Sequence, residues 1–346
     1  MEDVHFSKRD KIIIGIAAAV VIIVIIVLFH VVYLPMQRES SLYEIAQEGS
    51  SSDCDEYLSQ YPDGKYAYSV KRMKERKIKD EMQKYREEFH NGDYTRHTYS
   101  STILSIEVAR EFATYKGGTL YLDNLTWISI AVARELAKYT GILLSLDGLT
   151  EITEDVASEL ANCKVLSLSL DGLTSLSAAV VRELAKREGK GFYLDGLKNI
   201  TEEVTQEIAN FKSEMLSLDG LKMISKQVAR ELAKYKGKWL TLDGLTSISV
   251  EVACELVKYE GRLELRSLKV ITTETAHELA KLKGELHLSG LTLITVKVAH
   301  ELAKHKGNLG LYGLTEISVD VASELAKHEG TIYVKSDIEK EIEKYK

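Results

Sequence analysis

Histidines, which often act as general bases or metal ligands, gather in the last part of the chain. His300 and His305 flank a glutamate in the segment 300–305, which reads HELAKH. This segment is similar to the zinc-binding string His-Glu-x-x-His, but one extra residue separates Glu301 from the second histidine. An exposed position explains His277 and His300 better than a metal site does, because equivalent places in the chain hold Arg134, Ser158, Arg182, Gln206, Arg230, Cys254 and Ser323.

Aspartates form a second set, because they recur at a fixed spacing. The step is 24 residues between the aspartates and 23 residues thereafter, in the series Asp123, Asp147, Asp171, Asp195, Asp219, Asp243, Arg266, Ser289 and Tyr312. Carboxylates stacked about 5 Å apart repel one another, so something must offset their charge. We favour a structural role, in which each aspartate accepts backbone N–H bonds in its own turn. The alternative is a ladder that binds Ca²⁺ or a cationic partner.

Signatures of catalysis are missing from the sequence. It contains no Gly-x-Ser-x-Gly elbow, no P-loop, no dinucleotide fingerprint and no cysteine–histidine pair in a supporting context. The net charge of −7 argues against general nucleic-acid binding, which needs a basic surface. We therefore expect no enzymatic activity, no cofactor, no bound metal and no nucleic-acid partner.

The spacing of the aspartates is that of a repeat that covers two thirds of the chain. Each copy opens with alternating leucine and polar residues, as in Leu240-Thr241-Leu242-Asp243, which predicts a short strand with one apolar face. An Asp-Gly step follows, and glycine accepts the positive φ of a tight turn. A period in the twenties, held over about nine copies, predicts a solenoid of strand–turn–helix units.

Each copy then carries a serine or threonine where a helix should begin. Such a hydroxyl accepts a hydrogen bond from a backbone N–H of the first helical turn. The helices are expected to end in Lys-Tyr-Lys-Gly or a relative, with glycine in the C′ position. The first copy lacks a clean strand, as an N-terminal capping unit would. Ten helices are expected, after Ser105, Ser129, Thr153, Ser177, Thr201, Ser225, Ser249, Thr272, Thr295 and Ser318.

A strand and a helix in each copy, with a Leu-x-Leu core, resemble the leucine-rich repeat family over about residues 105–335. One position departs from the family's pattern, because leucine stands where asparagine is usual, at Leu149, Leu173, Leu221 and Leu245. An asparagine ladder is therefore not expected, and the copies are more similar to divergent bacterial variants. The resemblance implies an α/β fold, a curved solenoid with a parallel sheet, and binding of other macromolecules.

The exposed face of that sheet is the candidate binding surface. If Leu120, Leu122 and their equivalents point inward, the residues between them form columns on the outer face. Exposed aromatic residues such as Tyr121, Tyr193 and Trp239 would anchor a partner, since tyrosine and tryptophan dominate interface hot spots. The candidate residues are Tyr121, Asp123, Asp147, Asp171, Tyr193, Asp195, Asp219, Trp239, Asp243, Arg266, His287 and Tyr312.

The N-terminal region predicts a membrane anchor. Residues 12–34 contain no charged side chain, and a helix of that length measures about 34 Å, enough to cross a hydrocarbon core of about 30 Å. A cleaved signal peptide is the alternative, but the run is too long and no Ala-x-Ala-like site follows it. Lys8, Arg9 and Lys11 precede the span, which predicts a cytoplasmic N-terminus and a repeat domain in the periplasm or outside a cell, most simply a bacterial one.

The segment between the anchor and the repeats is highly charged and predicted to be helical. Residues 57–67 read YLSQYPDGKYA, which indicates a helix end, a Pro-Asp-Gly turn and a new helix. This string resembles the tetratricopeptide-like hairpins of bacterial envelope proteins. The resemblance covers one hairpin.

The sequence thus predicts five parts and one function. The parts are a cytoplasmic N-terminus (1–11), a transmembrane helix (12–34), a juxtamembrane helical hairpin with a linker (35–98), a leucine-rich-repeat-like solenoid (99–335) and a C-terminal capping helix (336–346). The expected function is to bind or scaffold other proteins on the extracytoplasmic side. The alternatives are an envelope protein that binds carbohydrate or peptidoglycan, and a structural spacer in a larger membrane complex.

Overall fold

The computed structural model describes residues 34–49, 51–90, 96–98, 104–115 and 118–346. The chain divides into two compact units, Met1–Lys84 and Tyr85–Lys346. The predicted transmembrane segment lies outside the described residues, apart from Leu34. Among the helices that are described, none has both the length and the apolar character needed to cross a membrane.

The described residues of the first unit form three helices, α2 (Leu34–Glu48), α3 (Ser51–Gln60) and α4 (Ala67–His90), the last of which continues past the boundary. The predicted turn between helices within residues 57–67 is confirmed. The Tyr57 hydroxyl fixes this turn, because it donates to Oε1 of Glu39 at 2.7 Å and accepts from the backbone N–H of Tyr66 at 3.1 Å. The small core of the unit consists of Ala46, Cys54, Tyr57, Ala67 and Val70.

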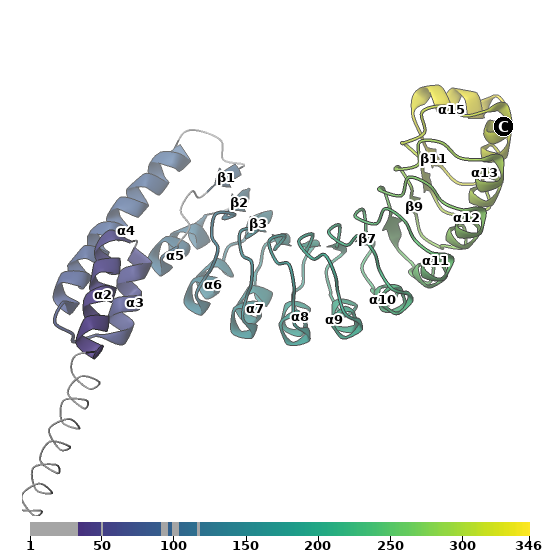
Figure 1. The fold of residues 1–346 in the computed structure, drawn as a ribbon. Helices are drawn as coiled ribbons and strands as arrows, with labels where there is room; N and C mark the ends of the chain where they lie inside the picture. Colours follow the sequence, from purple (N-terminus) through teal and green to yellow (C-terminus); the bar gives the residue numbers. More distant parts are fainter. Residues whose placement is uncertain (1–33, 50, 91–95, 99–103, 116–117) are drawn as a thin grey trace, which may run out of the picture. The chain divides into compact units, whose positions relative to one another are not determined.

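The described residues of the second unit form one sheet of 11 parallel strands, covered by helices, in which each strand pairs with the strands before and after it in the sequence. Figure 1 shows that the helices of this unit lie along one face of the sheet and leave the other face uncovered. The strands are β1 (Arg96–Thr98), β2 (Thr119–Tyr121), β3 (Leu143–Ser145), β4 (Ser167–Ser169), β5 (Gly191–Tyr193), β6 (Met215–Ser217), β7 (Trp239–Thr241), β8 (Arg262–Glu264), β9 (Leu286–His287), β10 (Leu309–Gly310) and β11 (Ile332–Tyr333).

One helix follows each of the first ten strands. These helices are α5 (Ile106–Thr114), α6 (Ile130–Leu136), α7 (Glu154–Ala161), α8 (Ala178–Leu184), α9 (Glu202–Ile208), α10 (Lys226–Leu232), α11 (Val250–Leu256), α12 (Thr273–Leu279), α13 (Val296–Leu302) and α14 (Val319–Leu325). Every serine or threonine cap predicted from the sequence is confirmed, since each side chain accepts the N–H three residues later. A last helix, α15 (Ser336–Glu343), buries Ile338 and Ile342.

The core of the solenoid is a file of leucines that passes from repeat to repeat. Leu146, Leu170, Leu194 and Leu218 are all completely buried. Equivalent strand positions pair in register, so each of these side chains packs on its counterpart in the next repeat. A single repeat cannot bury this file alone, and the stacking of repeats is therefore the source of stability.

The recurring glycines allow close packing between chain segments. The sequence instead predicts a positive φ at the Asp-Gly step and at the helix stop. Among the described residues only Gly118 has a positive φ, of 76°, so neither the Asp-Gly step nor the helix stop uses that conformation. A Cβ at Gly220 would lie 2.0 Å from the carbonyl oxygen of Asp195 in the preceding repeat. A Cβ at Gly237 would lie 2.1 Å from the Tyr235 hydroxyl. The helix before it already ends at a right-handed alanine cap, Ala233.

The start of the sheet also differs from the prediction. Strand β1 pairs in parallel with β2 ahead of the first repeat helix, where the sequence shows no clean strand. The pattern was missed because Arg96-His97-Thr98 contains no leucine.

Truncation of the leucine file tests this packing. We expect Leu194→Ala to lower the free energy of unfolding by about 2–5 kcal/mol, because it removes buried methyl groups and leaves a cavity. Met223 is 75% exposed, and Met223→Ala should change stability by less than about 0.5 kcal/mol. Urea unfolding of the full chain in mild detergent measures both, and equal losses would contradict the account.

Candidate binding face

The strand register places the predicted surface residues in columns on the uncovered sheet face. Paired positions run through Tyr121, Ser145, Ser169, Tyr193, Ser217, Thr241, Glu264, His287, Gly310 and Tyr333. A second column, two residues earlier, includes Leu143, Met215, Trp239 and Arg262. The aspartates and their successors form a third column just beyond the strands. We call these three columns the sheet face.

The aspartates form a hydrogen-bonded ladder between repeats. Oδ1 of Asp147 accepts the backbone N–H of Asp171 at 2.9 Å, and Oδ1 of Asp171 accepts that of Asp195 at 2.7 Å. The expectation that each aspartate serves its own turn is therefore wrong, because the bond crosses to the next repeat. The same bond joins Asp123 to Asp147, Asp195 to Asp219, Asp219 to Asp243, and Asp243 to Arg266.

Serine hydroxyls also bridge the aspartate carboxylates of adjacent repeats. The Ser169 hydroxyl lies 2.5 Å from Oδ1 of Asp147 and 3.1 Å from Oδ2 of Asp171. The Ser169 hydroxyl has one proton, which it donates to the nearer Asp147 oxygen or shares between the two carboxylates, and a proton on Asp171 would let the same hydroxyl also accept a hydrogen bond. The Ser145 hydroxyl likewise contacts Oδ1 of Asp123 and Oδ2 of Asp147.

Protonation near neutral pH is consistent with the burial of the ladder. Burial raises the pKa of Asp171 and of Asp243 to about 6, and repulsion from neighbouring carboxylates adds to the shift. Burial also raises the pKa of Asp195. The charges of Asp171 and Asp243 therefore change as the pH passes through about 6.

The ladder ends in a cluster of charged side chains. Arg266 takes the place of the next aspartate, and its Nη1 lies 3.7 Å from Oδ2 of Asp243. Glu264 sits between two arginines, 2.6 Å from Nε of Arg262 and 2.6 Å from Nη2 of Arg266. Arg262 also reaches Oε2 of Glu285 at 3.6 Å. We call Arg262, Glu264, Arg266, Glu285 and His287 the charged cluster.

Aromatic rings flank the charged cluster on both sides. The guanidinium of Arg262 lies 5.7 Å from the centre of the Trp239 ring, which is a cation–π contact. On the other side, Tyr333 stacks with His287 at 6.1 Å and with Tyr312 at 6.2 Å. The glycine between the strands of His287 and Tyr333 makes room, because a Cβ at Gly310 would lie 2.4 Å from Nδ1 of His287.

Exposure separates the anchors that a partner can reach from those it cannot. Trp239 is 47% exposed and Tyr312 is 51% exposed, although each is held by a neighbouring group. Tyr121 and Tyr193, the other predicted anchors, are only partly exposed. His287 is buried, and burial together with Arg262 lowers the pKa of its imidazole. Trp239 and Tyr312 are thus the accessible aromatic residues of this part of the face.

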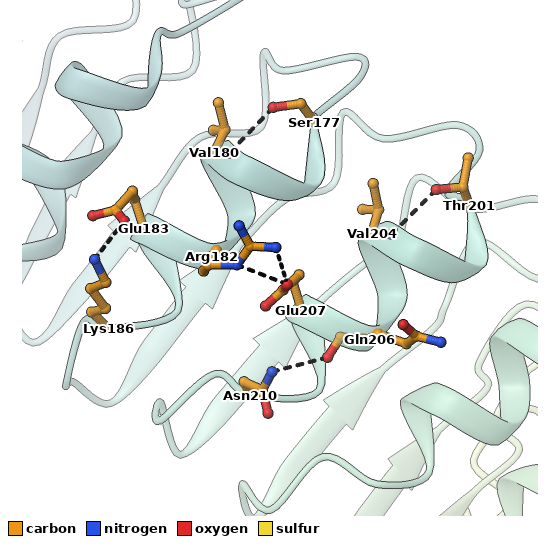
Figure 2. A network of polar contacts seen from close by, with 10 residues as sticks. All are labelled: Ser177, Val180, Arg182, Glu183, Lys186, Thr201, Val204, Gln206, Glu207 and Asn210. Atoms are coloured by element: carbon orange, nitrogen blue, oxygen red, sulfur yellow. Dashed lines mark hydrogen bonds and ion pairs between the residues drawn. The ribbon is translucent and has the colours of Figure 1, made fainter.

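The helix side carries a second ladder, which the sequence reasoning missed. Arg182 donates through Nε and Nη2 to Oε1 of Glu207 in the next repeat, at 3.0 and 2.6 Å (Figure 2). His277 and His300, which we expected to be merely exposed, make the same contact with Glu301 and Glu324 at 2.8 Å. The available signal was the glutamate that follows this position in every repeat.

The described residues hold no group of three or more histidine, cysteine, aspartate or glutamate side chains arranged for a metal ion. The sheet face therefore offers hydrogen bonds, ion pairs and aromatic surface. These are the contacts that protein recognition uses.

A parallel sheet, one helix per repeat and buried leucine files define the fold as a leucine-rich-repeat-like solenoid. Among solved structures, the chain is similar to TLR13 in a complex with ssRNA13, with 15% identity, a TM-score of 0.46, and coverage of 69% of this chain and 36% of that one. The chain therefore spans about a third of the length of TLR13. It is also similar to the internalin inlF from Listeria monocytogenes, with 16% identity, a TM-score of 0.36, and coverage of 71% and 83%. No family model and no curated protein matches the sequence.

Removal of one ladder charge tests the protonation of the aspartates. A group with a raised folded pKa adds stability that is complete below its unfolded value, near 3.8, and is lost as the pH rises through about 6. Asp171→Asn keeps the Oδ1 acceptor but cannot gain this proton. The melting temperature of wild type minus that of the variant should therefore rise between pH 7.5 and pH 4.5.

The matched control is Asp155→Asn, an exposed carboxylate on α7. The difference in melting temperature between wild type and Asp155→Asn should change less with pH than the difference for Asp171→Asn. A difference that falls towards acid pH for Asp171→Asn would refute the protonated ladder.

Proposed function

We propose that this chain is a membrane-anchored, leucine-rich-repeat-like protein that binds or scaffolds other proteins on the extracytoplasmic side through its sheet face. The anchor in this proposal is residues 12–34, for which the support is the uncharged sequence and the basic residues before it. No enzymatic activity is part of the proposal.

The observation that carries the proposal is the combination of Trp239 and Tyr312 on a rigid face. Both rings are about half exposed, and both are held in place by contacts with Arg262 and Tyr333. A ring that is already fixed loses little conformational freedom when a partner covers it. Hot spots of protein interfaces are rich in tryptophan, tyrosine and arginine, and all three residue types are present here.

The charged cluster supports specificity on the same surface. Its two arginines are paired with carboxylates inside the chain, so they are oriented before a partner arrives. Fixed charges reject partners of the wrong charge pattern and set the register of the right one.

Paired alanine variants test the use of this face. Trp239→Ala with Tyr312→Ala should remove the partners that are cross-linked to the wild-type chain in native membranes, with a loss of at least about tenfold, because truncation of a hot spot costs 2 kcal/mol or more. The readout is quantitative mass spectrometry of the cross-linked material.

The control removes two aromatic residues of similar exposure that lie off the sheet face. Trp127 and Tyr68 are 57% and 73% exposed, and the first lies in a strand–helix loop while the second lies on α4. Trp127→Ala with Tyr68→Ala should keep the partners. An unchanged set of partners in the sheet-face variant would refute the proposal, and retention of purified cell-wall glycan only by the intact face would favour the carbohydrate alternative.

A further inference from the structure

The position just after each repeat helix forms a column that is buried from Tyr139 onward, and several of its members hydrogen-bond to the preceding repeat. The Tyr139 hydroxyl donates to the carbonyl of Gly118 at 3.0 Å, that of Tyr235 to Ser213 at 2.7 Å, and that of Tyr259 to Gly237 at 2.9 Å. Each phenol is neutral and completes a hydrogen bond without charge. The column consists of Tyr115, Tyr139, Cys163, Arg187, Phe211, Tyr235, Tyr259, Leu282, His305 and His328.

Histidine replaces tyrosine in the last two repeats. His305 and His328 are 1% and 5% exposed, and their rings stack with centres 6.1 Å apart and planes 12° apart. Nδ1 of each ring lies 3.3 to 3.4 Å from a carbonyl oxygen, that of Ala280 or Ala303. A carbonyl can only accept, so Nδ1 carries the proton. In the described part of the chain, neither buried Nε2 has a hydrogen-bond partner.

The surroundings of the pair do not compensate a charge. Burial lowers the pKa of both imidazoles, and the nearby backbone carbonyls offset only part of that effect. His328 faces Lys346 from the segment after α15 and Glu329 from its own loop, and each histidine faces the other. A cavity of about 220 Å³ borders His305, lined mainly by charged residues, which are His300, Lys304, Lys306, Glu324, Lys327 and Glu329.

Because the pair lies in the terminal repeats, its protonation can be accommodated by local opening of those repeats. Each repeat of a solenoid is held only by its neighbours, so the terminal repeats can open while the others stay folded. The last two repeats are covered at the end of the chain by α15, which buries only two side chains, Ile338 and Ile342. Proton uptake in this region therefore needs only a local opening.

We propose that the stacked pair His305 and His328 makes the C-terminal repeats an acid-sensitive module, which opens reversibly in mildly acidic solution while the preceding repeats stay closed. Opening exposes both Nε2 atoms to water and separates the two rings. Tyr312 and Tyr333 belong to the same repeats, so opening also removes the aromatic end of the sheet face. The module thus regulates that face and does not depend on which partner binds there.

The aspartate ladder responds to acid in the opposite direction, so acid affects the two parts of the solenoid differently. Groups with a lowered folded pKa, such as the two histidines, add stability that is present above about 6.5 and is lost as the pH falls. The aspartates with a raised pKa respond in the opposite direction between about 6 and 3.8. Mild acid therefore loosens α13, α14 and β11 and tightens β4 to β7.

Hydrogen exchange of the full chain in mild detergent, corrected for intrinsic rates, tests the proposal. Between pH 6.5 and pH 5.5, the opening constant for amides of α13 and α14 should rise about tenfold for one proton taken up and up to about hundredfold for two. Amides of α7 to α9 should show no such rise. An equal rise in all repeats, or none in the last two, would overturn the proposal.

The matched variant is His305→Tyr with His328→Tyr, which restores the residue type used elsewhere in the column. It should abolish the acid response of the last repeats, while His277→Gln with His300→Gln, on the exposed helix face, should leave it intact. An acid response that persists in the tyrosine variant would refute the proposal. If the tyrosine variant does not fold, imidazole NMR of the wild type decides, because titration of both rings at or above the ordinary value of about 6.5 would refute it equally.

Discussion

The structure depends on the Oδ1 atom of each ladder aspartate, which accepts a backbone N–H from the next repeat. This bond occurs where a strand ends and the chain turns towards its helix, so it fixes the register of the successive turns from Asp123 to Arg266. The leucine file supplies most of the stabilising burial, but leucines alone are compatible with several registers. A directional bond at the same place in each repeat of the ladder selects one of these registers. The constraint also buries acidic groups one repeat apart, and burial, with a smaller contribution from repulsion between neighbours, raises the pKa of Asp171 and Asp243.

Three kinds of contact hold the repeats of the solenoid together. Leucines fill the interior, aspartates tie the strand ends, and arginine–glutamate pairs tie the helices on the other side. In the helix-side pairs the arginines are more than half exposed, whereas their glutamate partners are mostly buried. Pairs with one exposed member contribute modest stability. The aspartate ladder stops at Arg266, and the charged cluster with its aromatic neighbours begins at that point. The sheet face is therefore regular in its first repeats and individual in its later ones, which supports the proposed recognition region.

Much of the fold could be predicted because its signals are local. A capping serine acts on an N–H three residues away, and alternating leucines show which side of a strand is buried, so both predictions are confirmed. The contacts that were missed join residues about 24 positions apart. The sequence shows that Asp171 recurs with the repeat, but not that its acceptor serves Asp195 and not its own turn. The glycines misled for a related reason, because the carbonyl that excludes a Cβ at Gly220 belongs to the preceding repeat. Trp239 was predicted as an aromatic anchor and Arg266 as a member of the aspartate column, whereas the pairing of Arg262 with Glu264 could not be read from their types.

The most direct measurement of the central claim is the titration of the ladder carboxyl groups by ¹³C NMR of aspartate-labelled protein. The account predicts that Asp171 and Asp243 titrate near 6, well above the ordinary aspartate value. This result would place the carboxyl groups in a buried, mutually repelling stack that is bonded from repeat to repeat. Titration of both groups near 3.9, the value of an aspartate in water, would contradict the ladder.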